Sequence, residues 1–420
     1  MTKLHISPQD SLVDEALTVQ VTGAQPDQEV KIMARIPHLK MASEAVFQVD
    51  ENGQLDLSRQ APVSGSYDWL DSMGLIWSMK PEEKDGPPSM PNYSLEPFQI
   101  EFTLSTAQGD DQQKTVNRRW LAEGVTRKVL HEDELRGVCF FPPGDGPFPA
   151  VIIVSGSGGG ISEMRAALYA NRGFAALTLG YFAYEDRPKW LQNIPLEYFE
   201  AAARWLQAQP AVDPEKLVIT GGSRGGELSL LLGATFPIFK AVVANVPSSQ
   251  VWSGFGGEDG STRPAWVHKG EPVLFYVPKA REETTTEPDA PTEEPIALTP
   301  MFLKSMEDED FIQASTIPVE NTEAPILLIS GEDDQMWPST YFSKRVMARL
   351  KENNFSYPYE HRSYPDAGHV IVPGYMPLMP NHSLHPVDGK DYAFGGSPRE
   401  QAFANADSWR QVLRFLNENL

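Results

Sequence analysis

Residues 217–227 read Leu-Val-Ile-Thr-Gly-Gly-Ser-Arg-Gly-Gly-Glu, and this stretch decides the fold. A β-branched segment that predicts a strand runs into a Gly-x-Ser-x-Gly turn, and residues 228–232 then favour a helix. Such a turn holds its serine at a strained backbone position, so Gly221 and Gly225 leave room for the tight reversal. The pattern predicts that Ser223 is a catalytic nucleophile. The alternative is a glycine-rich turn with a solvated serine.

The same turn predicts half of an oxyanion hole, because the helix N-terminus carries a positive dipole end and the free N–H of Arg224. A second N–H normally comes from the loop after an earlier strand. Residues 150–154 predict that strand, and Ser155-Gly-Ser-Gly-Gly-Gly160 follows it, so we expect the N–H of Ser157 to be the second donor. A phosphate-binding loop is the rival interpretation, but neither the Walker pattern nor the Rossmann acid follows.

An acid and a histidine are expected downstream, in that order, if the fold is the α/β-hydrolase fold. Residues 325–330 predict a buried strand that stops at a turn rich in carboxylates. We choose Asp334 over Asp333 and Glu332, because it lies past the strand end, four residues before the helix that Pro338 opens. The alternative role for these acids is to cap that helix.

A histidine then follows the last predicted strand, residues 357–364, in the loop Pro365-Asp-Ala-Gly-His369. We predict that His369 is the general base: it takes the Ser223 proton, Asp334 stabilises the imidazolium, and the acyl-enzyme passes to water. The remaining histidines lie too early in the chain or lack this context: His5, His38, His131, His268, His361, His382 and His385.

The composition narrows the classes of partner. The 420 residues include 57 acidic and 35 basic side chains, a net charge of −22 that argues against nucleic acid and anionic membranes. No apolar run is long enough to span a bilayer, and no Cys/His cluster has metal-ligand spacing, so neither metal nor cofactor is expected. The single Cys139 excludes an internal disulfide framework, and the N-terminus lacks a signal peptide's apolar core. We therefore predict a cytoplasmic location.

Two domains are predicted. Residues 1–126 contain short alternating runs between turn residues, which are typical of a β-sandwich. In residues 127–420 strands alternate with helices, which predicts a doubly wound, mostly parallel sheet. The alternating runs are 17–22, 29–36 and 98–104, and the alternation of strand and helix runs through 150–154, 162–171, 175–179 and 196–209.

An insertion at about residues 254–300 contains the acidic, low-complexity stretch 281–294. It is interpreted equally well as a lid over the site or as a solvated loop. The last helix, residues 401–420, is expected to dock on a core through one apolar face. That face is formed by Phe403, Ala406, Trp409, Leu413 and Leu416.

Motifs along nearly the whole chain resemble one family, the α/β-hydrolase-type acyl-CoA thioesterases, together with the related bile acid-CoA:amino acid N-acyltransferases. The resemblance implies an Ig-like N-terminal sandwich and the hydrolysis of an acyl-CoA thioester to a free acid and CoA. The motifs are Gly-Ser-Tyr and Met-Gly-Leu-Ile-Trp within residues 62–79, the glycine loop with Glu163 and Arg165, the aromatic run in 173–186, and the surroundings of Ser223, Asp334 and His369.

The N-acyltransferase branch of this family carries cysteine as nucleophile, so Ser223 favours water as the acceptor without forbidding an amine. Transfer to an amino acid, a carboxylesterase or dienelactone-hydrolase-like activity, and a non-catalytic acyl-CoA binder stay open as alternatives. A homo-oligomer is compatible with the sequence.

Several residues are expected to contact the substrate. Gly156 and Gly158 let the backbone approach a ligand closely. Tyr181 is expected in an acyl tunnel, where packing is the alternative role. The CoA phosphates need a local cationic patch. Its candidates are Arg165, which we favour, and Arg187, Lys189 and Arg224.

Overall fold

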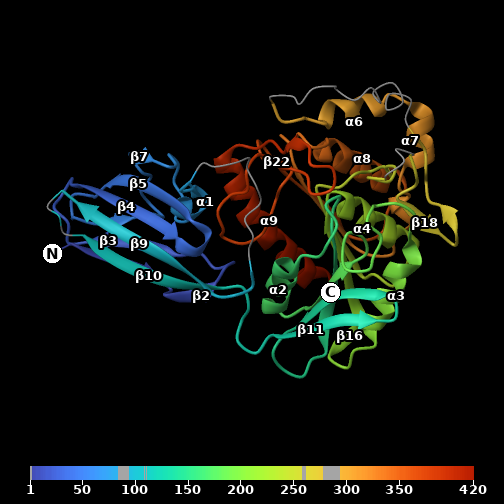
Figure 1. Ribbon diagram of the computed structural model, residues 1–420, viewed down its shortest axis with the longest axis horizontal. Coiled ribbons are helices and arrows are strands. Elements are labelled where there is room, and N and C mark those ends of the chain that lie inside the picture. Colours follow the sequence, from blue (N-terminus) through green and yellow to red (C-terminus); the bar gives the residue numbers. More distant parts are fainter. Residues whose placement is uncertain (1, 84–93, 108, 110, 258–261, 278–293) are drawn as a thin grey trace. The chain divides into compact units, whose positions relative to one another are not determined.

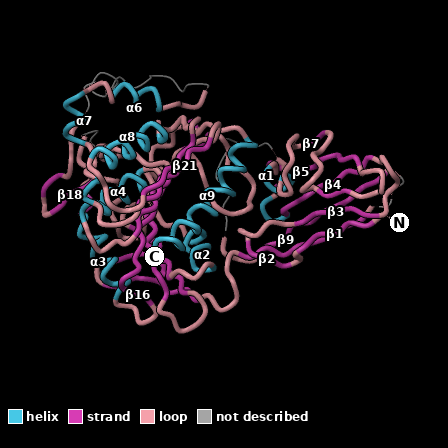
Figure 2. Tube along the Cα trace, turned by 180° about the vertical axis from the view of Figure 1, so that it is seen from behind, coloured by secondary structure: helices cyan, strands magenta, loops and turns pink. Residues whose placement is uncertain are grey.

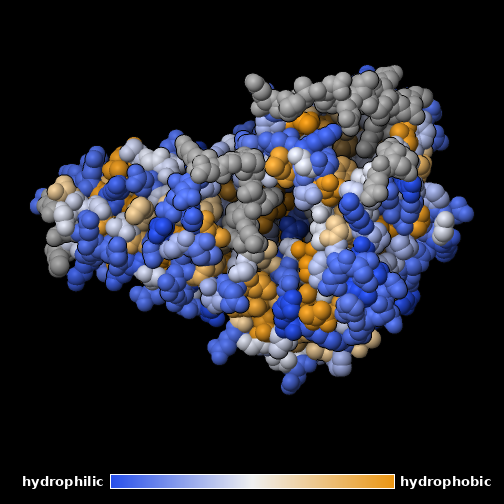
Figure 3. Space-filling view, in the orientation of Figure 1, coloured by the Kyte–Doolittle hydropathy of each residue, from blue (hydrophilic) through white to orange (hydrophobic). Residues whose placement is uncertain are grey.

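The computed structural model describes residues 2–420 except 84–93, 108, 110, 258–261 and 278–293, and the chain forms two units (Figure 1). The first unit consists of Met1–Ala122, Val372–Pro380 and Gln401–Ala406. The second consists of Glu123–Ile371, Asn381–Glu400 and Asp407–Leu420. The predicted segment 127–420 therefore contributes two short pieces to the first unit. Hydrophilic residues cover most of the face of each unit in Figure 3.

The first unit is a sandwich of two sheets in the described residues. One sheet has the order β1-β3-β6, and the other has the order β2-β10-β9-β4-β5-β7, with β8 paired to β5. The elements are β1 (Lys3–Ser7), β2 (Asp10–Leu12), β3 (Thr18–Thr22), β4 (Glu29–Ile36), β5 (Met41–Gln48), β6 (Leu55–Asp56), β7 (Ser64–Gly65), α1 (Gly74–Trp77), β8 (Lys80–Pro81), β9 (Phe98–Thr106) and β10 (Gln112–Arg119).

The burial of these strands follows the period of two that the sequence shows. Every second side chain of β4, from Val30 to Ile36, is buried, and the same holds for β9 from Phe98 to Leu104. Successive side chains of a strand point to opposite faces, so each strand gives one face to the core. The predicted β-sandwich is confirmed.

The Gly-Ser-Tyr and Met-Gly-Leu motifs serve packing in this unit. A Cβ at Gly74 would collide with the ring of Tyr67, so only glycine lets the short helix α1 approach that ring. The backbone N–H of Met73 donates to Asp71 at 2.8 Å, which holds the turn into α1. The motif therefore fixes α1 against the sheet.

The second unit contains the sheet β11-β12-β14-β13-β16-β17-β20-β21 in the described residues. The pairs β11–β12 and β12–β14 are antiparallel and the others are parallel. This order, with its antiparallel second strand, confirms the predicted α/β-hydrolase fold. The strands are β11 (Thr126–Glu132), β12 (Leu135–Phe141), β13 (Phe148–Val154), β14 (Ala175–Gly180), β16 (Val212–Gly222), β17 (Ala241–Asn245), β20 (Ile326–Gly331) and β21 (Tyr359–Tyr364).

Helices cover both faces of this sheet (Figures 1 and 2). Helices α3 (Leu196–Gln207), α4 (Arg224–Thr235) and α8 (Ser339–Glu352) share one apolar core with alternate residues of the strands. On the other face α2 (Glu163–Asn171) meets α9 (Pro398–Asn419), where the rings of Tyr169 and Trp409 lie 5.0 Å apart. Parallel strands buried on both faces explain the continuous apolar runs in the sequence.

Shorter elements surround the carboxyl edge of the sheet. They are β15 (Ile194–Pro195), β18 (Trp266–His268) and β19 (Glu271–Pro272), helices α6 (Thr299–Ser305) and α7 (Glu309–Ser315), and the hairpin β22 (His382–Leu384) with β23 (Asp391–Ala393). The described residues also form two single turns, η1 (Pro37–Leu39) in the first unit and η2 (Val319–Asn321) in the second. The prediction of a lid falls on the acidic stretch, of which residues 281–293 lie outside the described residues.

The buried stripe of α9 differs from the predicted one. Phe403 was expected on the docking face, but it is 53% exposed, and Leu413 is only half-buried. The buried side includes polar residues such as Asn405 and Ser408, followed by Val412 and Phe415. The side-chain oxygen of Asn405 accepts a hydrogen bond from the N–H of Val372 at 3.0 Å, so the buried side of the helix also makes a polar contact.

Arg118 ties the edge of the larger sheet in the first unit to the segment that follows β2. Its guanidinium is fully buried and donates to the carbonyl oxygens of Val13 at 3.0 Å and Glu15 at 2.9 Å, and to the hydroxyl of Ser11. Burial lowers the pKa of Arg118 to about 10. The arginine therefore satisfies buried acceptors that no backbone ladder reaches.

We predict that Arg118→Leu lowers the free energy of unfolding of the first unit by about 3 kcal/mol, because it removes these hydrogen bonds from a buried site and leaves the carbonyl oxygen of Glu15 and the hydroxyl of Ser11 without this donor. Urea unfolding followed by tryptophan fluorescence measures the change. Arg119→Leu is the matched control, because Arg119 forms a surface ion pair with Asp10 that contributes roughly 0–1 kcal/mol. Equal losses in the two variants would contradict the prediction.

Candidate active site

Ser223 lies between the end of β16 and the start of α4, with φ 58° and ψ −122°. A non-glycine residue rarely adopts such a backbone conformation, and it persists only where the surroundings enforce it. A Cβ at Gly221 would lie 2.5 Å from the carbonyl oxygen of Gly225, and a Cβ at Gly225 would lie 2.5 Å from that of Ser155. The two glycines thus allow the close approach that the sequence pattern predicts.

Asp334 and His369 are brought together by the loops that follow β20 and β21. The Nδ1 atom of His369 lies 2.8 Å from Oδ2 of Asp334, and both side chains are buried. The carboxylate also accepts the backbone N–H groups of Met336 and Trp337, each at 3.1 Å. Because Nδ1–H donates to the carboxylate, Nε2 of His369 is left as the acceptor that a general base requires.

The two neighbouring acids have other partners. A carboxylate oxygen of Asp333 accepts the N–H of Gly396 at 2.8 Å, and Glu332 accepts the hydroxyl of Ser363. Asp334 is therefore the acid that faces His369, as its position after the end of the strand predicts.

The nucleophile and the acid–base pair are joined through two consecutive residues at the end of β17, Asn245 and Val246. The N–H of Ser223 donates to the carbonyl oxygen of Asn245 at 3.0 Å, and the indole N–H of Trp337 donates to that of Val246 at 2.9 Å. The rings of Trp337 and His369 meet edge to face at 6.1 Å. The strands β16, β17, β20 and β21 run parallel, so their carboxyl ends share one edge of the sheet.

The glycine loop after β13 lies beside the nucleophile. A Cβ at Gly156 would stand 3.9 Å from Oγ of Ser223, so the loop backbone is close enough to line the space above the serine. The side chain of Ser157 contacts His385, with Oγ and Nε2 3.0 Å apart. A Cβ at Gly158 would lie 3.2 Å from Pro386.

Tyr181 supports this loop from below. Its hydroxyl donates to the carbonyl oxygen of Ser155 at 2.7 Å, and the ring is 1% exposed among Phe182, Phe199 and Trp266. The sequence predicts Tyr181 in an acyl tunnel, with packing as the alternative role. The structure places the ring in the core, where its packing and its hydrogen bond order the glycine loop.

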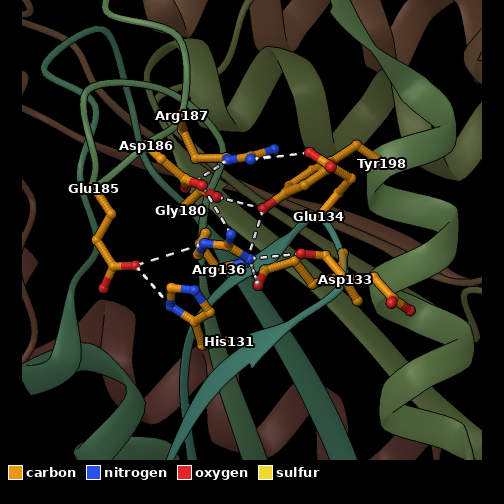
Figure 4. A network of polar contacts seen from close by, with 10 residues as sticks. His131, Asp133, Glu134, Arg136, Gly180, Glu185, Asp186, Arg187 and Tyr198 are labelled. Carbon is orange, nitrogen blue, oxygen red and sulfur yellow. Dashed lines mark hydrogen bonds and ion pairs between the residues drawn. The ribbon is translucent and has the colours of Figure 1, made fainter.

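Arg187 and Lys189, two of the four candidate cations for a CoA site, have other partners. Figure 4 shows Arg187 and Arg136 within a network of carboxylates, where Arg187 pairs with Glu134 at 3.0 Å and with Asp186 at 3.3 Å. Hydrogen bonds from Arg187 and Arg136 lower the pKa of Asp186 to about 2. The ammonium of Lys189 lies 4.4 Å from the ring centroid of Trp190.

Arg165, on α2, differs from these cations. Its side chain is half-buried, and Nη1 lies 3.8 Å from the position of a Cβ at Gly222, next to the nucleophile. In the part of the chain that the structure describes, no carboxylate forms an ion pair with it. Burial lowers the pKa of Arg165, which is the electrostatic effect of a guanidinium removed from water without a counter-charge.

Arg224 is buried behind the elbow. Its guanidinium donates to the carbonyl oxygens of Trp252 at 2.9 Å and Ser253 at 3.0 Å, and it lies 3.3 Å from the carboxylate of Glu227. The backbone N–H of Arg224 belongs to the first turn of α4, whose N–H groups have no intrahelical acceptor. The side chain therefore anchors the elbow, and the N–H is available to an oxyanion.

Glu227 completes this buried pair. Its Oε1 accepts the indole N–H of Trp266 at 2.9 Å, and the residue has no exposed surface. Burial raises the pKa of Glu227 to about 7, although Arg224 and Trp266 act in the opposite direction. The sequence shows Glu227 only as the last residue of the elbow stretch, and a carboxylate in a first helical turn is common, so its burial was not predicted.

In the described residues, no group of three or more His, Cys, Asp or Glu side chains is arranged to hold a metal ion. None of the helices in those residues is long and apolar enough to cross a membrane. Cys139 is buried in β12, and burial raises the pKa of its thiol, so this cysteine is protonated and enclosed.

The sheet order and the elbow define an α/β-hydrolase. A family model for the BAAT/acyl-CoA thioester hydrolase C terminal matches residues 194–420, and one for the acyl-CoA thioester hydrolase/BAAT N-terminal region matches residues 14–132. The chain belongs to this acyl-CoA thioester hydrolase/BAAT family.

Its relatives include two kinds of enzyme. Acyl-coenzyme A thioesterase 1 of Rattus norvegicus is 32% identical over 97% of this chain and 94% of its own. Acyl-coenzyme A amino acid N-acyltransferase 1 of Mus musculus is 32% identical over 100% of this chain and 98% of its own. Among solved structures, a putative dienelactone hydrolase from Klebsiella pneumoniae has a TM-score of 0.41 and 17% identity over 70% of this chain and 98% of its own.

We predict that Asp334→Asn slows labelling of Ser223 by a fluorophosphonate on the order of 10³-fold, because the amide no longer stabilises the imidazolium. Intact-protein mass spectrometry over time measures the rate. Glu332→Gln is the matched control and is expected to label at close to the wild-type rate. A loss of the same size in Glu332→Gln, or none in Asp334→Asn, would show that another acid orients the base.

A second prediction concerns Glu227. Its raised pKa means that the folded chain retains a proton that the unfolded chain releases above about pH 4.5, so this carboxyl weakens stability as pH rises towards about 7. In Glu227→Gln this contribution is absent, and the amide keeps the acceptor for Trp266. The Tm of the variant, relative to the wild type, is therefore expected to rise between pH 5 and pH 7.

Differential scanning fluorimetry across that pH range measures the Tm difference. Glu200→Gln is the control, because Glu200 forms an (i, i+4) ion pair with Arg204 near the surface of α3. A Tm difference for Glu227→Gln that is constant or falls with pH would contradict the assignment.

Proposed function

We propose that this chain hydrolyses acyl-CoA thioesters to the free acid and CoA through a serine acyl-enzyme. The observation that carries the proposal is the buried Asp334–His369 pair, at 2.8 Å, on the same sheet edge as the strained Ser223. Membership of a family whose members include acyl-CoA thioesterases supports the choice of substrate.

In the proposed reaction, Nε2 of His369 takes the Ser223 proton while Oγ attacks the thioester carbonyl carbon. The N–H groups of Arg224 and Ser157 are proposed to stabilise the tetrahedral anion, and loss of one such donor costs about 3 kcal/mol of barrier. CoA then leaves as the thiol with the proton from His369. Water, deprotonated by the same histidine, releases the acid.

We assign binding of an anionic group of CoA to Arg165. The protein has a net charge of −22, so a polyanionic substrate needs a local cation that internal carboxylates do not already neutralise. Arg187 pairs with carboxylates and Arg224 donates to two backbone carbonyls within the described structure, whereas Arg165 is half-buried beside the elbow without a paired carboxylate there. Gly156 and Gly158 are proposed to line the acyl group at the loop.

Hydrolysis is preferred to acyl transfer because Ser223 is the nucleophile, and the comparison with an amino acid N-acyltransferase keeps an amine acceptor as the alternative. A cytoplasmic location stays a prediction, which rests on the presence of a single cysteine, the buried Cys139. The same holds for a homo-oligomer and for the absence of a nucleic acid partner.

We predict that the purified chain releases CoA from one or more members of a saturated acyl-CoA panel, and that Ser223→Ala removes essentially all of this release. Thiol detection with a chromogenic disulfide follows the reaction, and a p-nitrophenyl ester of matched chain length runs in parallel. Glycine is added in a second series, and mass spectrometry of the products separates the free acid from the N-acyl amino acid.

Ester cleavage without CoA release would replace the proposal with a carboxylesterase. Formation of the N-acyl product at the expense of free acid would replace it with an acyltransferase. CoA release that survives in Ser223→Ala would remove the acyl-enzyme from the mechanism.

A further inference from the structure

The turn between β22 and β23 contacts the glycine loop through a histidine. Nε2 of His385 lies 3.0 Å from Oγ of Ser157, and Pro386 lies against Gly158. Ser157 directly follows Gly156, which is beside the nucleophile. His385, which is 228 positions away from Ser157 in the chain, thus contacts the side chain of the oxyanion loop.

The surroundings of His385 determine which of its nitrogens carries the proton. The backbone N–H of Val387 donates to Nδ1 at 3.3 Å, so Nδ1 is an acceptor and the proton lies on Nε2. Burial also lowers the pKa of His385, which favours the neutral ring. His385 therefore donates from Nε2–H to Oγ of Ser157.

Asp388 does not convert this pair into a second catalytic triad. Its Oδ1 lies 3.8 Å from Nδ1 of His385, beyond hydrogen-bond distance, and accepts the N–H of Lys390 at 3.1 Å. Its Oδ2 accepts the hydroxyl of Tyr392 at 2.7 Å. A general base would need a lone pair on Nε2, and Nε2 carries the proton instead. The arrangement orients Ser157 rather than activating it as a nucleophile.

His385 is held firmly enough for this role. Its ring packs edge to face on Phe255 at 5.0 Å and on Tyr392 at 5.9 Å. Its backbone N–H donates to the carbonyl oxygen of Lys390, and its carbonyl oxygen accepts the N–H of Gly389, both at 2.8 Å. The side chain is 10% exposed, so water competes little for Ser157.

We propose that His385 is a positioning residue, and that it turns the hydroxyl of Ser157 so that its own O–H donates to the oxyanion that forms at Ser223. A hydroxyl oxygen that accepts from His385 retains one O–H to donate, and the accepted bond fixes the direction of that donor. The inference rests on the proposed thioester hydrolysis. It adds a side-chain donor to the two backbone N–H groups and assigns a role to the β22–β23 hairpin.

The test compares His385→Phe, His385→Gln, Ser157→Ala and the double variant His385→Phe/Ser157→Ala in the CoA-release assay. An oriented donor acts on the transition state, so His385→Phe is expected to lower kcat on the order of tenfold to a hundredfold with little change in KM. His385→Gln retains an N–H donor at a similar reach and is expected to recover most of the rate. The double variant is expected to be no slower than Ser157→Ala, because both changes remove one interaction.

The matched control is His382→Phe, on the same hairpin, where Nδ1 of His382 lies 2.9 Å from Asp391. It is expected to keep the wild-type kcat. Equal losses in His385→Phe and His385→Gln, additive losses in the double variant, or an equal loss in His382→Phe would each overturn the inference, because each indicates a structural effect of the hairpin. A wild type without CoA release would refute the proposed function itself. An active wild type with an unchanged His385→Phe refutes only the role of His385.

Discussion

The catalytic arrangement depends on the backbone of Asn245 and Val246, which connects the nucleophile to the acid–base pair. The carbonyl oxygen of Asn245 accepts the backbone N–H of Ser223, and that of Val246 accepts the indole N–H of Trp337. The backbone N–H of Trp337 in turn donates to the carboxylate of Asp334. Val246 has φ 39°, which a β-branched residue adopts only when its surroundings enforce it, and its N–H donates to Ile329 at 2.6 Å. Ser223 and Asp334 are therefore positioned from the same point at the end of β17, and a shift of the backbone there would move both residues.

Local patterns in the sequence predicted the parts of the site whose geometry is local. The glycines around Ser223 report a close backbone approach, and the position of Asp334 after its strand separates it from Asp333 and Glu332. The contact between His385 and Ser157 could not be predicted, because it joins two loops 228 positions apart and neither carries a signal for the other. The exposure of Phe403 was missed for the same reason, since packing between elements decides it, and the sequence left Tyr181 open between an acyl tunnel and packing.

The excess of acidic side chains has a local structural use. Buried or half-buried arginines need acceptors. In the described residues, Arg136 and Arg187 find them in the carboxylates of Figure 4, and Arg118 and Arg224 find them in backbone carbonyls. Each guanidinium thereby holds together segments that are distant in the sequence. Arg165 stands apart from this pattern, because no carboxylate of the described residues forms an ion pair with it beside the elbow.

The first unit is built from three separate segments of the chain, and this determines when it can finish folding during synthesis. Within the first unit, Tyr375 donates its N–H to Val13 at 2.7 Å, Leu378 donates to Trp77 at 3.1 Å, and the rings of Trp77 and Tyr375 lie 5.3 Å apart. A ribosome releases residues 1–122 long before Val372–Pro380 and Gln401–Ala406. The sandwich therefore cannot be completed until residues 401–406 have been synthesised, and until residues 372–380 are made the carbonyl oxygens of Val13 and Trp77 lack the donors Tyr375 and Leu378.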